Sequence, residues 1–372
     1  MSYSVDDICS LMEAWAPPAY AYEWDRIGLL CGKRSAKVGH VLTCLSVNPA
    51  VYQEAVKRKA QMVVSHHPLI WDALKRLDED DPHTRMCLDF VRADIACFGA
   101  HTNLDIAAGG VNTCLAEALQ LQERAPLFPA PHLTNVKIVT FVPESHLDAV
   151  RDAMARAGAG QIGDYTSCSF VTPGTGTFMP GTGATPYSGR KGQLNREPEM
   201  RLEMIAPAQL SSAVVRALCA AHPYEEPAYD AIPLNNRADR LGLGIQGNLS
   251  KPLALDAFAA TVVAALGLGH VRVVGASKRK VSRVAVMGGA GGSEVRKLPR
   301  DIDVYVTGDV KYHDAEEAAK RGAALIDAGH WGTEKGIVPA MAAYLRRHCA
   351  GLKVSTFIEP DYFRVIAEQD VS

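Results

Sequence analysis

Five side chains of the kind that bind metal ions stand in three short motifs spread over most of the 372 residues. His66 and His67 are adjacent in VVSHHPLIW, Asp105 stands in AHTNLD, and His330 and Glu334 stand in DAGHWGTEKG. Each motif follows an apolar run that predicts a strand, and turns at strand ends direct side chains into a common crevice. Imidazoles and carboxylates without thiolates are typical of a hydrolytic metal centre, whereas structural zinc sites more often use Cys. The pattern predicts a metalloenzyme.

The spacing of these residues favours two metal ions over one. Neighbours such as His66 and His67 point to opposite sides of a strand, and Pro68 ends the strand directly after them. The simplest use of two diverging imidazoles is one for each ion. His330 and Glu334 are four residues apart and can face the same side of a helix. Five ligands suffice for two ions only if a carboxylate bridges them, and water would fill the remaining positions, as in a catalytic site.

Each motif has an ordinary alternative explanation when it is taken alone. A pair of histidines is more often a surface or core feature than a ligand pair, and a His-to-Glu spacing of four is common on any helix. The combination of all three motifs at strand ends is what favours a metal centre over these alternatives.

A second group of polar residues also follows predicted strands. His101 lies in AHTNLD, and Asp309, Lys311 and His313 lie in TGDVKYHDA. These four residues are the catalytic candidates, as groups that orient ligands, transfer protons or contact substrate. The alternative is that Asp309 caps a helix whose start is exposed. Gly288–Gly292 (GGAGG) could bring backbone amides to a phosphate, but it lacks the Lys-Ser/Thr of a P-loop.

Composition restricts the partners and the compartment. The net charge of −2 gives no reason to expect nucleic acid, and no apolar stretch reaches the roughly 18 residues that a membrane helix needs. The first fifteen residues carry acidic groups where a secretory signal would be basic. The nine cysteines are odd in number and form no CxxC pair, which favours reduced thiols and a cytoplasmic protein.

The chain alternates predicted strands and helices in its first and last thirds, which indicates an α/β metal domain built from residues 1–128 and 248–372. The middle, residues 129–247, has the order β-α-β-β-α-β of a ferredoxin-like α+β insert. A segment rich in proline, Ala125–Asn135, is predicted to be a linker. The glycine-rich stretch at 172–199 is predicted to be a long loop without strands.

These motifs together resemble the Nif-three-like dinuclear metal-centre proteins, also described as GTP cyclohydrolase type 2 homologues. WDRIGLLCG, SHHPLIW, AHTNLD, GGAGG, TGDVKYHDA and GHWGTEKGIVP carry the resemblance over almost the whole chain. It implies that two divalent metal ions are held by His66, His67, Asp105, His330 and Glu334, with Glu334 as the bridge. It also implies two intertwined, similar α/β halves and a toroidal homohexamer. GTFMPGTGATPYSG and HPYEEPAYD resemble the PII/CutA-like insert of longer members.

Two positions depart from the pattern of that family. Ser46 stands where the family usually has Asp, and Arg26 stands where it usually has Asn. Neither is a predicted ligand, so the departures concern substrate contact or the orientation of ligands. The sequence does not select among zinc, manganese and iron, because histidine and carboxylate sites accept all of them.

The resemblance implies a hydrolase that opens the purine imidazole ring of GTP with water activated by the metals. In that reaction His101 or His313 would move protons, and Lys311 with the GGAGG amides would meet the triphosphate. Two alternatives remain open. One is a regulatory or scaffold protein whose metals stabilise a hexamer and whose insert binds an effector. The other is a two-metal phosphoesterase, which uses the same types of ligand.

Overall fold

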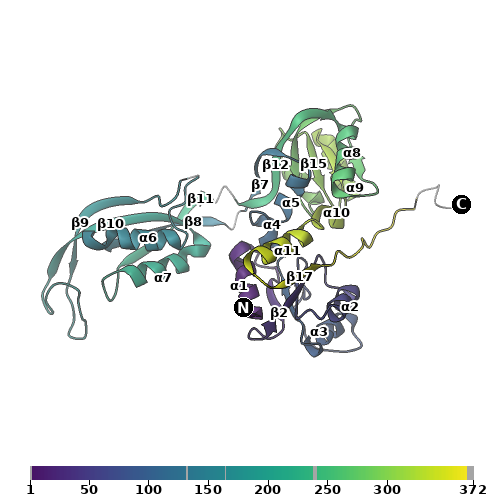
Figure 1. Cartoon of the computed structure of the whole chain (residues 1–372). Helices are drawn as coiled ribbons and strands as arrows, with labels where there is room; N and C mark the ends of the chain where they lie inside the picture. Colours follow the sequence, from purple (N-terminus) through teal and green to yellow (C-terminus); the bar gives the residue numbers. More distant parts are fainter. Residues whose placement is uncertain (1, 131–132, 164, 238–240, 367–372) are drawn as a thin grey trace. The chain divides into compact units, whose positions relative to one another are not determined.

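The structure is a computed structural model, and it describes residues 2–130, 133–163, 165–237 and 241–366 (Figure 1). The chain forms two compact units, one of Met1–Pro129 with Arg240–Ser372 and one of Ala130–Asp239. The smaller unit ends earlier along the chain than residue 247, the end predicted from the sequence. The reason is that strand β12 (Gly242–Ala254) pairs with two strands of the first unit. Positions 131–132 of the predicted linker lie outside the described residues.

The first sheet of the larger unit has five strands in the order β17-β4-β5-β6-β2. They are β17 (Lys353–Thr356), β4 (His40–Cys44), β5 (Met62–Ser65), β6 (Ala96–Gly99) and β2 (Gly28–Cys31). Strands β17, β4, β5 and β6 run parallel, and β2 is antiparallel to β6. β4, β5 and β6 are buried along their whole length, as expected for parallel strands covered on both faces.

The second sheet has six strands in the order β13-β16-β15-β14-β12-β7. They are β13 (Arg272–Val274), β16 (Ala324–Asp327), β15 (Val304–Thr307), β14 (Lys280–Val286), β12 and β7 (Gln122–Pro129). Strands β14, β15 and β16 are parallel, and the other pairs are antiparallel.

In the first sheet β4, β5 and β6 follow one another along the chain and run parallel, and the antiparallel strand β2 lies beside β6. In the second sheet β14, β15 and β16 do the same, and the antiparallel strand β13 lies beside β16. The two parts of the chain that build the larger unit also exchange strands. β7 comes from the first part of the chain and pairs with β12, whereas β17 comes from the last part and pairs with β4. The predicted α/β class is confirmed, and both parts of the chain are needed to complete either sheet.

The prediction that Ala125–Asn135 is a linker was wrong for its first half, because β7 extends to Pro129. Pro126 and Pro129 indicated a linker because proline cannot donate a ladder hydrogen bond. An edge strand tolerates this defect, and β7 is the last strand of its sheet.

Helices of the larger unit pack against these sheets and supply three of the candidate ligands. They are α1 (Val5–Trp15), α2 (Pro49–Lys57), α3 (Pro82–Arg92), α4 (Thr102–Ile106), α5 (Val111–Ala118), α8 (Leu255–Leu266), α9 (Tyr312–Arg321), α10 (His330–Glu334) and α11 (Ile337–His348). Asp105 lies on α4, and His330 and Glu334 lie on α10. A two-stranded sheet pairs β1 (Tyr3–Ser4) with β3 (Lys37–Val38). Ser4 caps α1 through a reciprocal capping box with Asp7.

The smaller unit contains β8 (Thr134–Val142), α6 (Leu147–Arg156), β9 (Phe170–Phe178), β10 (Asn195–Pro207), α7 (Ser211–Ala221) and β11 (Tyr229–Arg237). Its sheet is antiparallel with the order β11-β8-β10-β9, which is the ferredoxin-like arrangement predicted for the insert. Both helices pack on one face of the sheet, where Ile138 and Leu202 meet Val150 and Val214. The prediction of a loop without strands at 172–199 was wrong, because β9 and β10 both extend into it.

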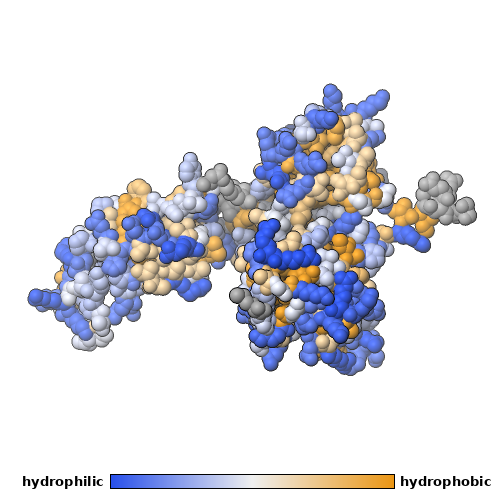
Figure 2. Space-filling model, in the orientation of Figure 1, coloured by the Kyte–Doolittle hydropathy of each residue, from blue (hydrophilic) through white to orange (hydrophobic). Residues whose placement is uncertain are grey.

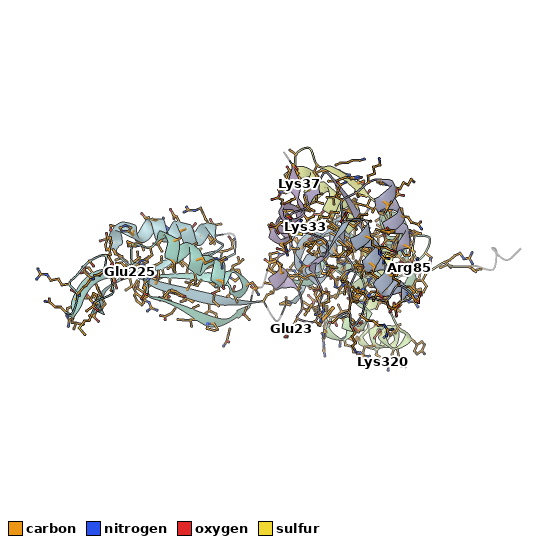
Figure 3. All side chains as sticks on the ribbon, turned by 90° about the horizontal axis from the view of Figure 1, so that it is seen from below. Glu23, Lys33, Lys37, Arg85, Glu225 and Lys320 are labelled. Carbon is orange, nitrogen blue, oxygen red and sulfur yellow. The ribbon has the colours of Figure 1, made fainter. Side chains whose placement is uncertain are left out.

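Exposed charges lie on the outside of both units, including Glu23, Lys33, Arg85 and Glu225 (Figure 3). The surface also carries hydrophobic areas, and one of them is the segment before residue 367, where Phe363, Val365 and Ile366 are exposed (Figure 2). Among the described residues, every helix is too short or too polar to cross a membrane.

Candidate metal centre

His66 is the first of the candidate ligands along the chain. It directly follows β5 and is completely buried. Its Nδ1 lies 2.8 Å from the carbonyl oxygen of Ala100. A carbonyl can only accept, so Nδ1 carries a hydrogen, and Nε2 is the nitrogen that loses its proton when the ring becomes neutral. That Nε2 lies 3.7 Å from Oδ1 of Asp105 and 3.7 Å from Oε1 of Glu334. These three side chains form one group of potential ligands.

His67 faces a second group on the other side of the same glutamate. Its Nε2 lies 2.9 Å from Oε2 of Glu334, and Nε2 of His330 lies 3.0 Å from the same oxygen. The two Nε2 atoms are 3.3 Å apart. Successive histidines therefore diverge as predicted, and the two oxygens of Glu334 face different histidines. The structure brings all five predicted ligands together.

Three buried polar atoms at this point make no hydrogen bond of normal geometry with any described residue: Nε2 of His66, Oδ1 of Asp105 and Oε2 of Glu334, although two imidazole nitrogens lie within 3.0 Å of the last. Such atoms are normally hydrogen-bonded, because an unpaired buried polar group costs about 1–3 kcal/mol. These atoms converge on one small space. Cations bound there would supply the missing partners.

A further ring of polar groups fixes the orientation of the histidines. Asp309 Oδ2 lies 2.8 Å from Nδ1 of His330, and Ser46 Oγ lies 2.7 Å from Nδ1 of His67. Both contacts hold the second ring nitrogen, which leaves Nε2 facing Glu334. This is the usual outer partnership of histidine ligands. Asp309, a catalytic candidate, therefore orients a histidine and is not part of a helix cap.

His101 is the second catalytic candidate at the centre, and its nitrogen lies close to those of His66 and His67. Its Nδ1 is 2.8 Å from Oδ1 of Asp25, a buried carboxylate that also accepts a hydrogen bond from the Thr102 amide at 3.0 Å. Burial would raise the pKa of Asp25, but the hydrogen bonds from His101 and Thr102 outweigh it and lower that pKa to about 2.

Sequence reasoning missed Asp25 as a functional residue and assigned no definite role to Ser46. Asp25 stands in the WDRIG motif and Ser46 in CLSVN. The sequence did draw attention to both segments, because the chain departs from the family pattern at Arg26, next to Asp25, and at Ser46 itself. The structure places the Ser46 hydroxyl against Nδ1 of His67, where it orients this candidate ligand.

The other two catalytic candidates lie away from the centre. His313 is on α9 with its side chain 81% exposed, and its Nδ1 is 3.6 Å from Oε2 of Glu316. Lys311 is exposed just before that helix. Neither lines the cavity above the metal ligands. Within this chain, the geometry does not support the roles expected for these two residues, which were proton transfer for His313 and phosphate contact for Lys311.

The glycine loop has a different role from the expected phosphate contact. The amides of Gly288 and Gly289 donate to Asn112 Oδ1 and Thr333 Oγ1, each at 2.9 Å, so they are not available to an anion. Gly289 has φ +65°, and a Cβ there would lie 2.2 Å from Oε1 of Glu334. Glycine is required at this position because the backbone passes so close to the shared carboxylate.

The protonation of the candidate ligands would make metal binding dependent on pH. Burial disfavours a charged imidazole, but the carboxylates of Asp105 and Glu334 outweigh it and raise the pKa of His66 to about 9. Burial is likewise outweighed at His330, where Glu334 and Asp309 raise the pKa to about 9. Both rings are therefore protonated at neutral pH in the metal-free protein, and a metal must displace these protons.

We expect the affinity of the metal-free protein for Zn²⁺ or Mn²⁺ to rise as the pH is raised from 6 to 9. Calorimetric titration in buffers of different ionisation enthalpy would count the protons released at pH 7. Protons from both His66 and His330 should appear on binding. An affinity that is constant over this range, with no proton release, would contradict the assignment of these rings as ligands.

Replacing Ser46 should weaken metal binding through His67. Ser46→Ala removes the hydrogen bond to Nδ1, and loss of such an outer partner typically costs about 10–100-fold in metal affinity. Ser46→Asp should bind at least as tightly as the natural chain, because a carboxylate can hold the same nitrogen. Competition with a chromophoric chelator gives the affinity. Ser293→Ala, at an exposed serine, is the matched control, and equal affinities for Ser46→Ala and this control would refute the role.

A large cavity of about 1140 Å³ opens above the metal ligands. His67, His101 and His330 are at its base, and Trp71 stands beside His101 with ring centroids 5.0 Å apart in an edge-on arrangement. The polar lining includes Arg272, whose side chain pairs with Asp327. The centre is therefore accessible to a molecule of substantial size.

Comparison with known proteins places this architecture in a family. A family model described as Duf34/NIF3 (NGG1p interacting factor 3) matches residues 3–361. The chain belongs to the Duf34/NIF3 family. The resemblance inferred from the sequence motifs is thereby confirmed.

Curated relatives cover most of the chain. A protein of Halalkalibacterium halodurans named "GTP cyclohydrolase 1 type 2 homolog" is 40% identical over 324 residues, 87% of each chain. One of Mycobacterium tuberculosis with the same name is 38% identical over 353 residues, 94% of this chain and 93% of the relative. A solved Bacillus cereus protein related to NIF3 superposes with a TM-score of 0.86 at 39% identity, covering 98% of this chain and 99% of its own.

Proposed function

We propose that this protein is a dinuclear metal-dependent hydrolase that acts on a nucleotide-like heterocycle, with GTP ring opening as the leading case. The observation that carries the proposal is the shared carboxylate of Glu334. One of its oxygens faces His66, and the other faces His67 and His330. A carboxylate between two groups of ligands is the arrangement that two cations require.

The residues that would hold the metals are His66 and Asp105 on one side, His67 and His330 on the other, and Glu334 between them. Divalent cations bound there would supply Lewis acidity and lower the pKa of water toward neutrality. Zinc, manganese and iron all suit this set of nitrogen and oxygen donors.

The protein's own groups would position the substrate and move protons. Trp71 offers a flat apolar wall beside the centre, against which a planar heterocycle can stack. His101 borders the same cavity, and Asp25 holds its Nδ1. The opposite nitrogen of His101 would hold or deliver a proton at the reacting ring, as a general acid or base within reach of the substrate. The curated relatives' name, "GTP cyclohydrolase 1 type 2 homolog", supports GTP as the first substrate to test.

His101→Gln should separate catalysis from metal binding. We expect the variant to keep its metals and to lose about 10²–10⁴-fold in turnover, which is the range for removal of a general acid or base. Elemental analysis and initial rates measured on the same preparation would test this. Loss of metal from the variant would instead make His101 a ligand. His313→Ala serves as the control and should retain both metal and rate, because its side chain is exposed.

The proposal is tested by incubating the metal-loaded protein with a panel of nucleotides and identifying products by mass spectrometry. Formate and a ring-opened purine derivative are expected from GTP. Inorganic phosphate or a nucleoside monophosphate would indicate a phosphoesterase at the same centre. A metal-loaded protein without turnover across the panel would refute the hydrolase and favour the regulatory alternative.

We also propose that the protein assembles as a homohexamer, in which a PII/CutA-like smaller unit helps to close the ring. The antiparallel order β11-β8-β10-β9 of that unit is compatible with this likeness. Light scattering of the full chain measures the mass, and a monomer at micromolar concentration would contradict the proposal.

A further inference from the structure

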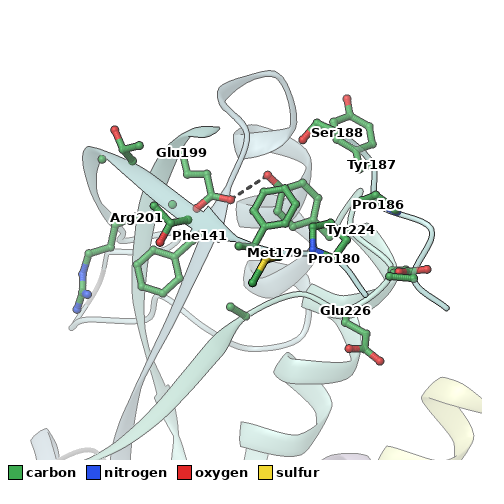
Figure 4. A pocket seen from close by; sticks show the side chains of 18 of the residues that line it. Phe141, Met179, Pro180, Pro186, Tyr187, Ser188, Glu199, Arg201, Tyr224 and Glu226 are labelled. Carbon is green, nitrogen blue, oxygen red and sulfur yellow. Dashed lines mark hydrogen bonds between the residues drawn. The ribbon is translucent and has the colours of Figure 1, made fainter. Parts of the chain in front are cut away.

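The smaller unit contains a cavity of its own, of about 560 Å³, which the metal centre does not use (Figure 4). β9 and the loop after it form one wall, and residues of β10 and the segment before β11 form another. The volume falls within the range of pockets that take small molecules. The glycine-rich segment at 172–199 and the HPYEEPAYD segment, both singled out in the sequence, meet at this cavity.

The cavity contains a buried acid. Glu199, on β10, is 9% exposed, and its Oε1 accepts a hydrogen bond from the Tyr224 hydroxyl at 2.8 Å. A Cβ on Gly176 would lie 2.0 Å from Oε2 of Glu199, so the glycine on β9 provides the space in which this carboxylate lies. Burial and the bond to Glu199 raise the pKa of Tyr224, which therefore stays a neutral donor.

No cation among the described residues forms an ion pair with Glu199. The basic residue that the cavity lining includes, Arg201, pairs with Glu203 at 2.8 Å, and Lys137 also pairs with Glu203. Glu225 and Glu226 add further negative charge to the lining. The cavity thus has excess negative charge, and a buried carboxylate without a counter-ion favours a positively charged guest.

Aromatic rings line the cavity that contains the acid. Tyr187 and Tyr224 have ring centroids 5.8 Å apart, and Phe141 lines the same cavity. Figure 4 shows Tyr224 bonded to Glu199, Phe141 and Met179 below them, and Tyr187 farther to the right, beyond Tyr224. Aromatic faces attract cations through their quadrupole, and such rings next to a carboxylate are a typical receptor for an organic ammonium group.

We propose that this cavity binds an organic cation, a protonated or quaternary amine with an apolar body. Glu199 receives the charge, and the rings of Tyr187 and Tyr224 receive the body. The inference is independent of the hydrolase, because every residue that it uses belongs to the smaller unit.

The test is a ligand-observed NMR titration of the full-length, metal-loaded protein with benzylamine, benzyl alcohol and benzoate. These probes share a ring and differ in charge. Benzylamine should bind at least about tenfold more tightly than the neutral and anionic probes, since only it meets both the acid and the rings. Equal binding of all three probes, or no binding of benzylamine, would overturn the proposal.

Two variants locate the binding. Glu199→Gln keeps the shape and should weaken benzylamine binding by about tenfold or more, whereas Asp148→Asn, at an exposed carboxylate of the same unit outside the cavity lining, should change it by less than about twofold. Tyr187→Ala, at a side chain that is already 54% exposed, should fold normally and bind several-fold more weakly. If Glu199→Gln binds benzylamine like the natural chain, the proposal is wrong. If Glu199→Gln or benzylamine changes the oligomeric mass, the cavity is an interface between copies and the proposal is also wrong.

Discussion

Glu334→Gln is expected to abolish metal binding at both positions of the centre with little change in shape. The amide keeps the size of the carboxylate but loses the charge and one acceptor oxygen, and it can no longer bridge two cations. Both groups of ligands include this side chain, one through Oε1 and the other through Oε2. Elemental analysis after exposure to Zn²⁺ or Mn²⁺ and desalting should give two metals per natural chain and close to none per variant.

The comparison needs a glutamate outside the centre. Glu316→Gln, on α9, changes a surface residue paired with Lys320 and His313. This control should retain both metals. Full occupancy in the Glu334 variant would contradict the bridging role. Loss of one metal only would mean that the two positions bind independently and that Glu334 belongs to a single position.

Gly289→Ala is expected to disable the centre without touching any ligand. The added Cβ would lie 2.2 Å from Oε1 of Glu334 and 3.2 Å from Nε2 of His330, so both ligands must move. Alanine is also strained at φ +65°, at a cost of about 1–2 kcal/mol. We expect the metal content to fall to near zero and the free energy of unfolding to decrease by at least that strain.

Gly269→Ala is the matched control for this variant. Gly269 is exposed in the same unit, and a Cβ there would meet no atom within 4 Å. Its metal content and unfolding midpoint should equal those of the natural chain. Chemical denaturation, followed by circular dichroism and combined with elemental analysis, measures both quantities. Normal metal content in Gly289→Ala would show that Glu334 does not need its observed position.

The ligands could be predicted from sequence because each motif follows its strand directly. β5 ends at Ser65 and the two histidines follow it, and His330 and Glu334 begin and end the helix just after β16. Local order along the chain thus determines where these side chains lie. The same holds for the smaller unit, whose alternation of strands and helices predicted the ferredoxin-like order.

The polar groups that orient the histidines could not be derived in this way. Asp25 is 76 residues from His101, and Ser46 is 21 residues from His67. Their roles depend on hydrogen bonds formed only after the sheet assembles, and neither residue type is diagnostic by itself. His313 shows the opposite error, since its position after a strand suggested a role that its exposed place on α9 does not support.

The exchange of strands between the two sheets was implied by resemblance and not by the hydrophobic pattern. β7 reads as a linker because of its prolines, and only its pairing with β12 identifies it as an edge strand. Pairings between distant segments, such as β17 with β4, carry no local signal. Long-range pairing is the part of this fold that a pattern of neighbours does not encode.

Anomalous diffraction from crystals of the manganese- or zinc-loaded protein tests the central claim most directly. The account predicts two peaks per chain on either side of the Glu334 carboxylate, one beside His66 and Asp105 and one beside His67 and His330. A single peak, or peaks that avoid Glu334, would contradict it.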